Sequence, residues 1–466
     1  MNNSNKDKLR TIEKVGYGSG DFACSMYWTI FAQFLLFYYT DVIGLAVTSV
    51  STILLITRLW DTVNDPLMGL VADRTRSRFG RYRPWLIWMI LPMLISGVLV
   101  FTVPDISTNM QLWYVFLTYT AVGMVYTAIN LPYAALMGVM TSVESERTSL
   151  ATFRYIGSFL GNLVPQLTLL YLVSIIGQGN DQIGYVGSII IYGLLAGVLF
   201  WFTFKLTKER VQPLESTEKI SAKKDLKSLL GNKPWAIIAV AGALALVSLS
   251  IKNSVTIYYF KYYIDDQDLV SGFLALGTIS AMIGICFTKK IINLSGGKRN
   301  GYLVVNLMSV IGCILFYLVG PENLILLYLL QAFYMFFMGP MMPLMFSLYA
   351  DTADYGELKF GRRTTGLIFA SGTSAIKMGM TVGAALSGWI LGYVGYQANV
   401  VQSEETLYSI KLLMSWIPAL FSLFGLIVLY FYPLNKKAEE NMYQELELRR
   451  QNGVASVAQS IEREAD

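Results

Sequence analysis

Three polar side chains occur close together inside one apolar stretch of the sequence. Asp61 and Asp65 are four residues apart, with Asn64 between them, so a helix would place all three on one face. Two carboxylates and an amide oxygen are suitable ligands for a small hard cation, and sodium is the metal that we expect here. A bound proton is the alternative, because two like charges at this spacing repel each other. An ion pair with Arg58 or with a basic residue on another span is the structural alternative.

A second group of side chains has the chemistry that sugar binding requires. Asp21, Ser25 and Trp28 are spaced by four and three residues and would share a helical face. The carboxylate can accept hydrogen bonds from paired hydroxyl groups, and the indole ring can cover the apolar face of a pyranose. We therefore predict substrate binding here, whereas a helix cap at Asp21 is the structural alternative.

Further polar residues lie within apolar stretches elsewhere in the chain. They are Thr127, Asn130, Arg154, Thr373 and Lys377. A charge inside an apolar span needs a carboxylate partner or contact with water, although a long lysine side chain can also extend to the membrane surface. Thr127 and Asn130 are three residues apart, and Pro132 after them can free backbone carbonyl oxygens toward a cavity. We expect a functional role for Lys377, with Thr373 one turn before it.

Segments of mixed charge follow two of the apolar stretches. Their aspartates and arginines could form ion pairs that open and close as the protein changes conformation, although solvated loop charge is the alternative. The residues of this predicted conformational ion-pair cluster are Asp73, Arg74, Asp351, Asp354, Glu357 and Arg363.

The composition places these residues in a membrane protein. Of the 466 residues, 54% are hydrophobic and 14% are charged, compared with roughly 25% charged in soluble domains. Apolar runs of about 20 residues recur along the chain and predict transmembrane helices. The absence of histidine excludes histidine proton relays and Ser-His catalysis. The net charge of +5 does not indicate nucleic-acid binding, since the basic residues lie in short segments between apolar runs.

The apolar runs predict twelve spans in two groups of six. They lie at 17–43, 48–73, 84–104, 111–140, 148–177, 184–206, 234–263, 269–292, 301–320, 323–350, 364–394 and 407–432. We therefore expect an N-terminal six-helix bundle at 1–206, a central linker at 207–233, a C-terminal six-helix bundle at 234–434 and a tail at 435–466.

Basic residues are concentrated in alternate connections. The N-terminal tail, the loop at 74–83, the central linker and the C-terminal tail are rich in Lys and Arg, whereas the other connections are acidic or neutral. Because cytoplasmic loops carry the excess of Lys and Arg, this pattern predicts a multi-pass protein of a bacterial cytoplasmic (inner) membrane, with the linker, the tail and both termini in the cytoplasm.

The two groups of spans are weakly similar to each other. The fifth span of the first group opens with RTSLATF at 147–153, and the fifth span of the second group opens with RTTGLIF at 363–369. Matches at the same position in both groups indicate two repeats related by an axis along the membrane normal. This is the layout of the major facilitator fold, an all-α polytopic membrane protein with two six-helix bundles.

Long motifs resemble one family of transporters. The stretch from Arg58 to Pro84 (RLWDTVNDPLMGLVADRTRSRFGRYRP), GYGSGDF near the start, FYYTDVIGL, NLPYAAL and ADTADYGE, with Lys377 after them, resemble the glycoside–pentoside–hexuronide:cation symporters, which include the melibiose permease. The resemblance covers nearly the whole chain. It implies cation-coupled sugar uptake, with the cation among Asp61, Asn64, Asp65 and Thr127.

The resemblance also implies a sugar site, with one departure. Asp21, Arg154, Thr373 and Lys377 would line or organise that site. Asn130 and Ala134 stand where the melibiose permease has an aspartate and, nearby, a tryptophan, which favours a pentoside, a xylo-oligosaccharide or a hexuronide over an α-galactoside.

We therefore expect a symporter of sodium or protons that imports its sugar by alternating access. It should need no cofactor and no partner beyond the sugar, a monovalent cation and the lipid bilayer, and it should function as a monomer. A major facilitator that moves a lipid or drug is the first alternative, although its cavity would be more apolar. An intramembrane enzyme is a remote alternative, because Asp61 and Asp65 lie inside a span and histidine is absent.

Overall fold

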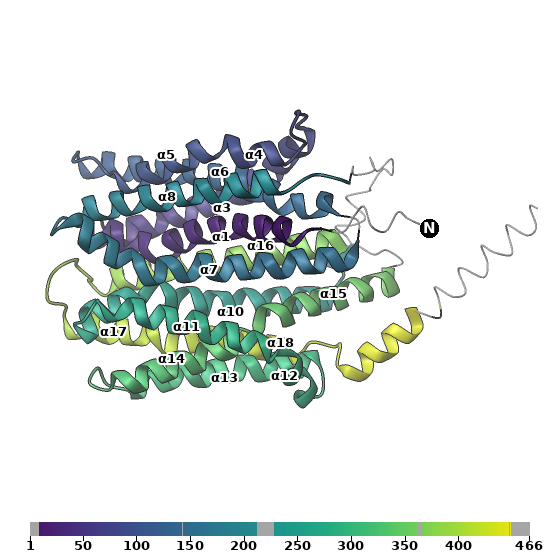
Figure 1. Ribbon diagram of the computed structural model, residues 1–466. Coiled ribbons are helices and arrows are strands. Elements are labelled where there is room, and N and C mark those ends of the chain that lie inside the picture. Colours follow the sequence, from purple (N-terminus) through teal and green to yellow (C-terminus); the bar gives the residue numbers. More distant parts are fainter. Residues whose placement is uncertain (1–8, 142, 212–227, 361–364, 447, 449–466) are drawn as a thin grey trace, which may run out of the picture. The chain divides into compact units, whose positions relative to one another are not determined.

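The computed structural model describes residues 9–141, 143–211, 228–360, 365–446 and 448, and these residues are mostly helical (Figure 1). The first half begins with a helical segment that runs from α1 (Thr11–Thr29) through the π-helical turn η1 (Ile30–Phe34) and α2 (Leu35–Phe37) to a second π-helical turn, η2 (Tyr38–Val42). It continues with α3 (Val47–Arg74), α4 (Arg83–Trp88), α5 (Ile90–Phe101), α6 (Thr108–Met140), α7 (Glu144–Gly177) and α8 (Asp181–Leu206).

The second half repeats this arrangement of long helices. It contains α10 (Lys233–Tyr258) with the π-helical turn η3 (Tyr259–Ile264), α11 (Leu269–Cys286), α12 (Thr288–Ser295) and α13 (Lys298–Leu318). It ends with α14 (Leu324–Met338), α15 (Met341–Phe360), α16 (Thr365–Tyr393), α17 (Glu404–Met414) and α18 (Trp416–Tyr430). A further helix at 436–446 follows.

Each of the twelve predicted spans overlaps one or more of these helices. Within the described residues, nine segments are long and apolar enough to cross a membrane. The other three predicted spans correspond to the first helical segment, to α3 with its charged residues, and to α4 together with the shorter apolar helix α5.

The chain forms two compact units. Unit 1 consists of Met1–Ser216, Ile251–Thr278 and Thr381–Met414, and unit 2 of Thr217–Ser250, Ile279–Met380 and Ser415–Asp466. Unit 1 thus contains the first six spans together with parts of α10, α11 and α16 and the whole of α17. Of the predicted linker, 212–227 lies outside the described residues, as does most of the tail.

Glycines allow α1 and α7 to pack closely in unit 1. A Cβ atom on Gly157 would collide with the backbone oxygen of Gly18, and one on Gly161 would collide with the backbone oxygen of Phe22. Gly157 and Gly161 are four residues apart, which is the small-residue spacing that lets transmembrane helices approach each other. This contact determines which polar residues of α1 and α7 face each other.

The basic loop between α3 and α4 is held by Glu209. Its carboxylate accepts hydrogen bonds from the backbone N–H groups of Arg81, Tyr82 and Arg83, at 2.8, 2.8 and 2.9 Å. Gly80 has φ +108 and a Cβ there would collide with the Glu209 carboxylate, so both the backbone conformation and the space at this position favour glycine. The loop is therefore fixed to the segment that follows α8.

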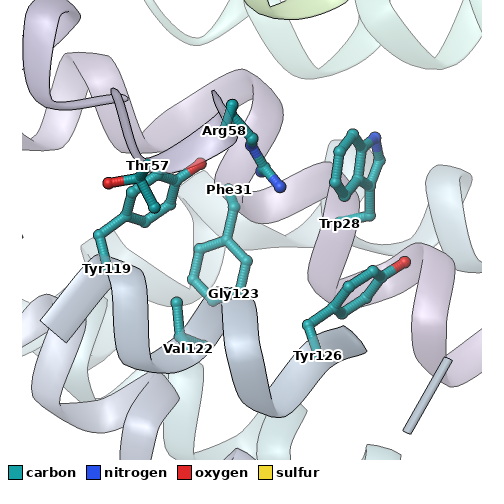
Figure 2. Close-up of a pocket in the computed structure, with 8 residues that line it drawn as sticks. All are labelled: Trp28, Phe31, Thr57, Arg58, Tyr119, Val122, Gly123 and Tyr126. Atoms are coloured by element: carbon teal, nitrogen blue, oxygen red, sulfur yellow. The ribbon is translucent and has the colours of Figure 1, made fainter. Parts of the chain in front are cut away.

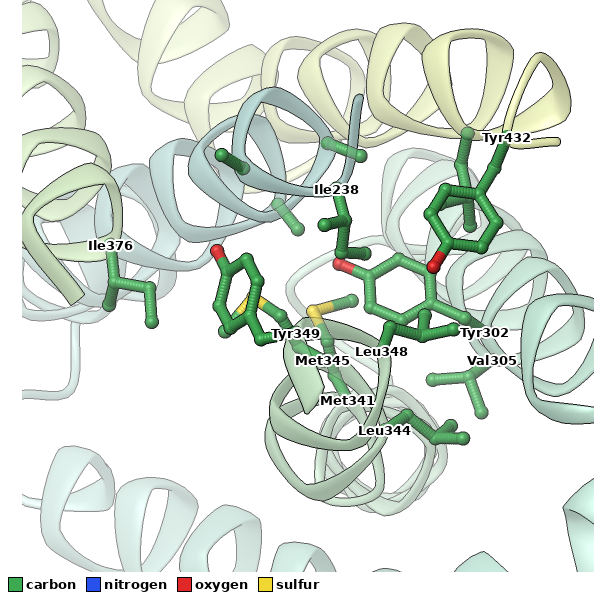
Figure 3. Packing of buried hydrophobic residues seen from close by; sticks show 14 of the residues in the cluster. Ile238, Tyr302, Val305, Met341, Leu344, Met345, Leu348, Tyr349, Ile376 and Tyr432 are labelled. Carbon is green, nitrogen blue, oxygen red and sulfur yellow. The ribbon is translucent and has the colours of Figure 1, made fainter. Parts of the chain in front are cut away.

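The apolar core of unit 2 lies between α10, α13, α15 and α18. Figure 3 shows Ile238 and Tyr302 packed with Met345 and Leu348, and these four side chains are buried. The helix at 436–446 adds Met442 and Leu446 to this core.

The same C-terminal helix also makes polar contacts in unit 2. Lys298 Nζ lies 2.8 Å from Asp351 and 2.6 Å from Glu439, and the Tyr443 hydroxyl donates to Asp351 at 2.7 Å. The start of the tail is therefore part of the folded unit.

Replacing Glu209 with glutamine should destabilise the protein by about 1–3 kcal/mol, because charge-assisted hydrogen bonds to three backbone N–H groups become weaker neutral ones. The Tm of the purified protein should fall. Lys208→Gln is the matched control, since Lys208 is exposed. Equal Tm values for Glu209→Gln and Lys208→Gln would contradict this role.

Candidate functional site

The predicted cation-binding residues lie on two facing helices of unit 1. Asp61 and Asp65 are one turn apart on α3, and Gly123 and Thr127 are one turn apart on α6. Thr127 Oγ1 donates a hydrogen bond to Asp65 Oδ1 at 3.0 Å. A Cβ atom on Gly123 would lie 3.2 Å from Asp61 Oδ1, so the absence of a side chain there leaves room for this carboxylate. The structure therefore brings together the predicted residues from both helices.

The oxygen atoms at this position suit a small monovalent cation. Asp61, Asn64 and Thr127 are buried, and Asp65 is partly exposed. Asn64 Nδ2 has no hydrogen-bond partner in the described part of the chain. Carboxylate, amide and hydroxyl oxygens are the ligands that hard cations prefer. Among the described residues, no group of three or more His, Cys, Asp or Glu side chains is arranged to hold a metal ion.

Arg58 connects this position to an aromatic pocket. Its Nη1 atom lies 3.1 Å from Asp61 Oδ2, and its guanidinium carbon lies 4.4 Å from the centre of the Trp28 ring and 5.4 Å from that of Tyr119. Stacking over two rings is a favourable environment for a guanidinium group. Arg58 therefore contacts both a predicted cation ligand and a predicted sugar-binding ring.

Figure 2 shows the Arg58 side chain extending toward Trp28, with Tyr126 below that ring. The Trp28 and Tyr126 ring centres are 5.8 Å apart. The pocket is lined by Trp28, Phe31, Thr57, Arg58, Tyr119, Val122, Gly123 and Tyr126. Because Arg58 and Gly123 line the pocket and also adjoin Asp61, the aromatic surface and the carboxylate belong to one region of unit 1.

Three further substrate-binding candidates of the first half, Asp21, Ser25 and Arg154, lie along the contact between α1 and α7. Arg154 Nε is 3.3 Å from Asp21 Oδ1, and the Ser25 and Ser158 hydroxyl groups are 2.7 Å apart. Arg154 thus has the carboxylate partner that a charge inside an apolar span needs. Its guanidinium group also lies 5.6 Å from the Tyr133 ring centre.

Three substrate-binding candidates do not belong to these contacts. Asn130 is partly exposed on α6, almost one turn beyond Thr127. Thr373 and Lys377 are exposed and one turn apart on the part of α16 that belongs to unit 2. Their roles at a sugar site stay predictions.

The predicted conformational ion-pair cluster is spread over both units. In unit 1, Asp73 accepts a hydrogen bond from the Tyr82 hydroxyl at 2.7 Å, and Arg74 is exposed. In unit 2, Asp351 pairs with Lys298, a residue absent from the predicted cluster. Asp354 and Glu357 follow on α15, and Arg363 lies outside the described residues. The opening and closing of this cluster stays a prediction.

Several residues of this region were missing from the predicted site. Gly123 lies four residues before Thr127, and Ser158 lies four residues after Arg154. Helical periodicity from the predicted residues would have found both positions. Arg58 was considered as an ion-pair partner, but its stacking on Trp28 is a side-chain contact between two different helices, α3 and α1. The sequence carries no local signal for such a contact.

Comparisons with known proteins identify the family of the chain. The sequence profile of the family described as "MFS/sugar transport protein" matches residues 16–436. A putative glycoside/cation symporter, YagG of Escherichia coli K12, is 36% identical over 94% of this chain and 95% of its own length. The isoprimeverose transporter of Lactiplantibacillus pentosus is 32% identical (95% and 92%). A glucuronide carrier protein homologue of E. coli K12 is 30% identical (95% and 96%).

Solved structures share the fold. The nucleoside transporter NupG superposes with a TM-score of 0.64 at 14% sequence identity, covering 92% of this chain and 99% of its own. A bacterial homologue of the human lysosomal transporter Spinster superposes with a TM-score of 0.63 at 11% identity, covering 93% and 97%. The predicted all-α major facilitator fold is thereby confirmed, and the enzyme alternative is excluded because the family and its relatives are transporters. The chain belongs to the MFS/sugar transport protein family and, within it, to the glycoside–pentoside–hexuronide:cation symporters of the major facilitator superfamily.

Proposed function

We propose that this member of the sugar symporter family imports a pentoside, a xylo-oligosaccharide or a hexuronide together with sodium or a proton, by alternating access. The observation that supports this best is the position of Arg58, which pairs with Asp61 and stacks on Trp28. A cation at Asp61 and Asp65 would compete with Arg58 for the Asp61 carboxylate. Since the same guanidinium group touches Trp28, cation binding would change the surface that a sugar meets.

Coupling of this kind needs only a modest energy. A cation-filled site that binds sugar about 5–150-fold more tightly than the empty site corresponds to about 1–3 kcal/mol. Changes in one charge-assisted contact are of that size. By reciprocity, the sugar would strengthen cation binding by the same factor, so that the two are released together.

The polar character of the site supports the proposed substrate class. Asn130 and Ala134 on α6 provide neither an additional carboxylate nor an indole ring. A cationic side chain such as that of Arg154 would favour a substrate with a carboxylate, such as a uronic acid. A relative named for isoprimeverose and a relative named for a glucuronide support the pentoside class and the hexuronide class of the proposal. A lipid or drug would favour a more apolar surface than this one.

The proposed orientation follows from the charge distribution. The loop at 74–83, the segment after α8 and the tail carry many Lys and Arg residues, which would place them and both termini in the cytoplasm of a bacterial cell. The sugar would then enter from the ends of the helices opposite to the termini.

Thermal stabilisation by sugars provides the first test. Purified protein should gain stability with xylosides or glucuronides but not with galactosides, and sodium or a lower pH should increase that gain, because a ligand that binds the native state stabilises it by RT ln(1 + [L]/Kd). Asp21→Asn should lose the gain, since the amide neither carries the charge that pairs with Arg154 nor accepts hydrogen bonds through two oxygens.

The matched control for that variant is Asp181→Asn, which changes a carboxylate in the first turn of α8. Both variants should show an undisturbed elution profile without sugar. A normal sugar response in Asp21→Asn would place the pocket elsewhere, and no response of the unmodified protein to any of these sugars would contradict the proposed substrate class.

Replacing Asp65 with cysteine should abolish cation-driven sugar accumulation while sugar exchange continues. The substitution removes a charge and the oxygen that accepts from Thr127, but it leaves the aromatic pocket intact. Uptake and exchange of radiolabelled sugar would be measured in membrane vesicles. Asp105→Cys, in the exposed connection before α6, is the control. Active accumulation in Asp65→Cys at the unmodified level would exclude the coupling role.

Replacing Gly123 with alanine should weaken the effect of the cation on sugar affinity several-fold. The new Cβ would lie 3.2 Å from Asp61 Oδ1 and displace a predicted cation ligand. Gly138→Ala is the matched control on the same helix, because nothing lies within 4 Å of a Cβ there, and both substitutions bring the same gain in helix propensity. Sugar binding would be titrated by calorimetry with and without the cation. An equal cation effect in the two variants would show that Asp61 does not need this space.

A further inference from the structure

A buried carboxylate outside the predicted sites lies at the end of the first helical segment. Asp41 belongs to the π-helical turn η2, and its side chain is 1% exposed. A buried charge is costly unless it is paired and hydrogen-bonded. Local π-helical turns often occur at functional positions. Asp41 therefore requires an explanation that the cation and sugar sites do not provide.

The side chains that satisfy Asp41 come mostly from the second half of the chain. Lys261 Nζ lies 2.8 Å from Asp41 Oδ1, and the Tyr262 hydroxyl donates to the same oxygen. The Tyr396 hydroxyl donates to Asp41 Oδ2 at 2.6 Å. Lys261 and Tyr262 belong to η3, and Tyr396 follows α16. All of these residues belong to unit 1, so this part of the second half packs against the first half within one compact body.

Asn399 completes the group by contacting three of its members. Its Nδ2 atom donates to the Asp41 backbone oxygen at 2.6 Å, and its Oδ1 atom accepts from Lys261 Nζ at 2.7 Å. Its backbone N–H donates to the Tyr262 hydroxyl at 2.9 Å. Asn399 has φ 58, a left-handed conformation that asparagine tolerates better than most residues. We call Asp41, Lys261, Tyr262, Tyr396 and Asn399 the Asp41 cluster.

Contacts beside the cluster join the same parts of the chain. The Thr40 and Tyr258 hydroxyl groups are 2.8 Å apart, and Trp389 Nε1 donates to Thr52 Oγ1 at 3.1 Å. Ser51 is fully buried at the start of α3, where it lies so close to Gly388 of α16 that a Cβ on this glycine would collide with it. Within unit 1, the parts of the second half that carry η3 and the end of α16 thus pack against the first half around the Asp41 cluster.

We propose that the Asp41 cluster is a polar latch that holds the ends of the helices opposite to the termini closed in the conformation described. The proposal rests on the proposed alternating-access function, because opening toward the sugar on that side would separate the first helical segment from η3 and from the segment after α16. Opening breaks the Lys261 and Tyr396 contacts with Asp41 together, and water must then replace them. The cluster thereby sets the equilibrium between the closed and open states of this end.

The test measures how often this end opens. In a background without the native cysteines, Ser51→Cys places a reporter thiol at a fully buried position beside Gly388. The protein is placed in lipid nanodiscs without sugar, and the rate of reporter labelling by a polar maleimide is measured. Both membrane faces are then accessible, so the result does not depend on the proposed orientation. Asp41→Asn and Lys261→Met should each increase the rate ~10-fold, equivalent to about 1.4 kcal/mol in the opening equilibrium.

Two further variants control the measurement. Lys289→Met removes an exposed lysine from α12 and should leave the rate unchanged. Tyr396→Phe removes a single hydroxyl group from the cluster and should raise the rate by a smaller factor. If Asp41→Asn and Lys261→Met fail to give a folded protein, as judged by elution profile and Tm, the labelling rate of Tyr396→Phe shows whether the Asp41 cluster limits opening.

Unchanged labelling in Asp41→Asn and Lys261→Met, or in Tyr396→Phe where those variants do not fold, would overturn the latch. Because no sugar is added and the coupling cation is held constant, such a result would leave the proposed substrate and coupling untouched. Conversely, a protein that is not stabilised by any of the tested sugars could still show the predicted labelling rates. The two proposals therefore fail separately.

Discussion

The presence of two carboxylates within α3, the buried Asp61 and the partly exposed Asp65, is the constraint on which the candidate site depends. A carboxylate in such surroundings must find a cation, a hydrogen-bond donor or water. The structure provides Arg58 beside Asp61 and Thr127 beside Asp65, and it leaves a glycine, Gly123, where α6 passes Asp61. Under the proposed function, a coupling ion at these carboxylates would have to replace the pairing of Arg58 with Asp61.

Between α1 and α7, glycine residues make the room that the polar residues need in order to meet. In a membrane, burial of apolar side chains against lipid provides little force for helix association, so close packing and interhelical hydrogen bonds determine which helices meet. Gly157 and Gly161 let the two backbones approach, and the Asp21–Arg154 pair lies beside that contact. The glycines therefore determine the geometry of the polar pair, because any larger residue would move Arg154 away from Asp21.

Much of this arrangement could be predicted from the sequence because it follows from local periodicity. The twelve apolar runs, the shared face of Asp61 and Asp65, and the need of Arg154 for an acidic partner all depend on residue type and helical spacing. What could not be predicted depends on contacts between distant segments. The position of Arg58 between Trp28 and Tyr119, the three backbone hydrogen bonds of Glu209 and the partners of Asp41 have no signal within their own helices. Substrate identity is a further step away, since helical spacing shows which polar residues share a face but not which molecule they bind.

The first helical segment connects these features. It carries Asp21 and Trp28 near the candidate sugar site and ends with Asp41 in η2. Twenty residues separate Asp21 from Asp41, which is about 30 Å along a helix, and the π-helical turns η1 and η2 lie between Trp28 and the end of the segment. A ligand shifts a conformational equilibrium only by its difference in affinity for the two states. A sugar that contacts Asp21 and Trp28 better when this segment is tilted would therefore act on the Asp41 cluster through the segment itself, without a separate relay.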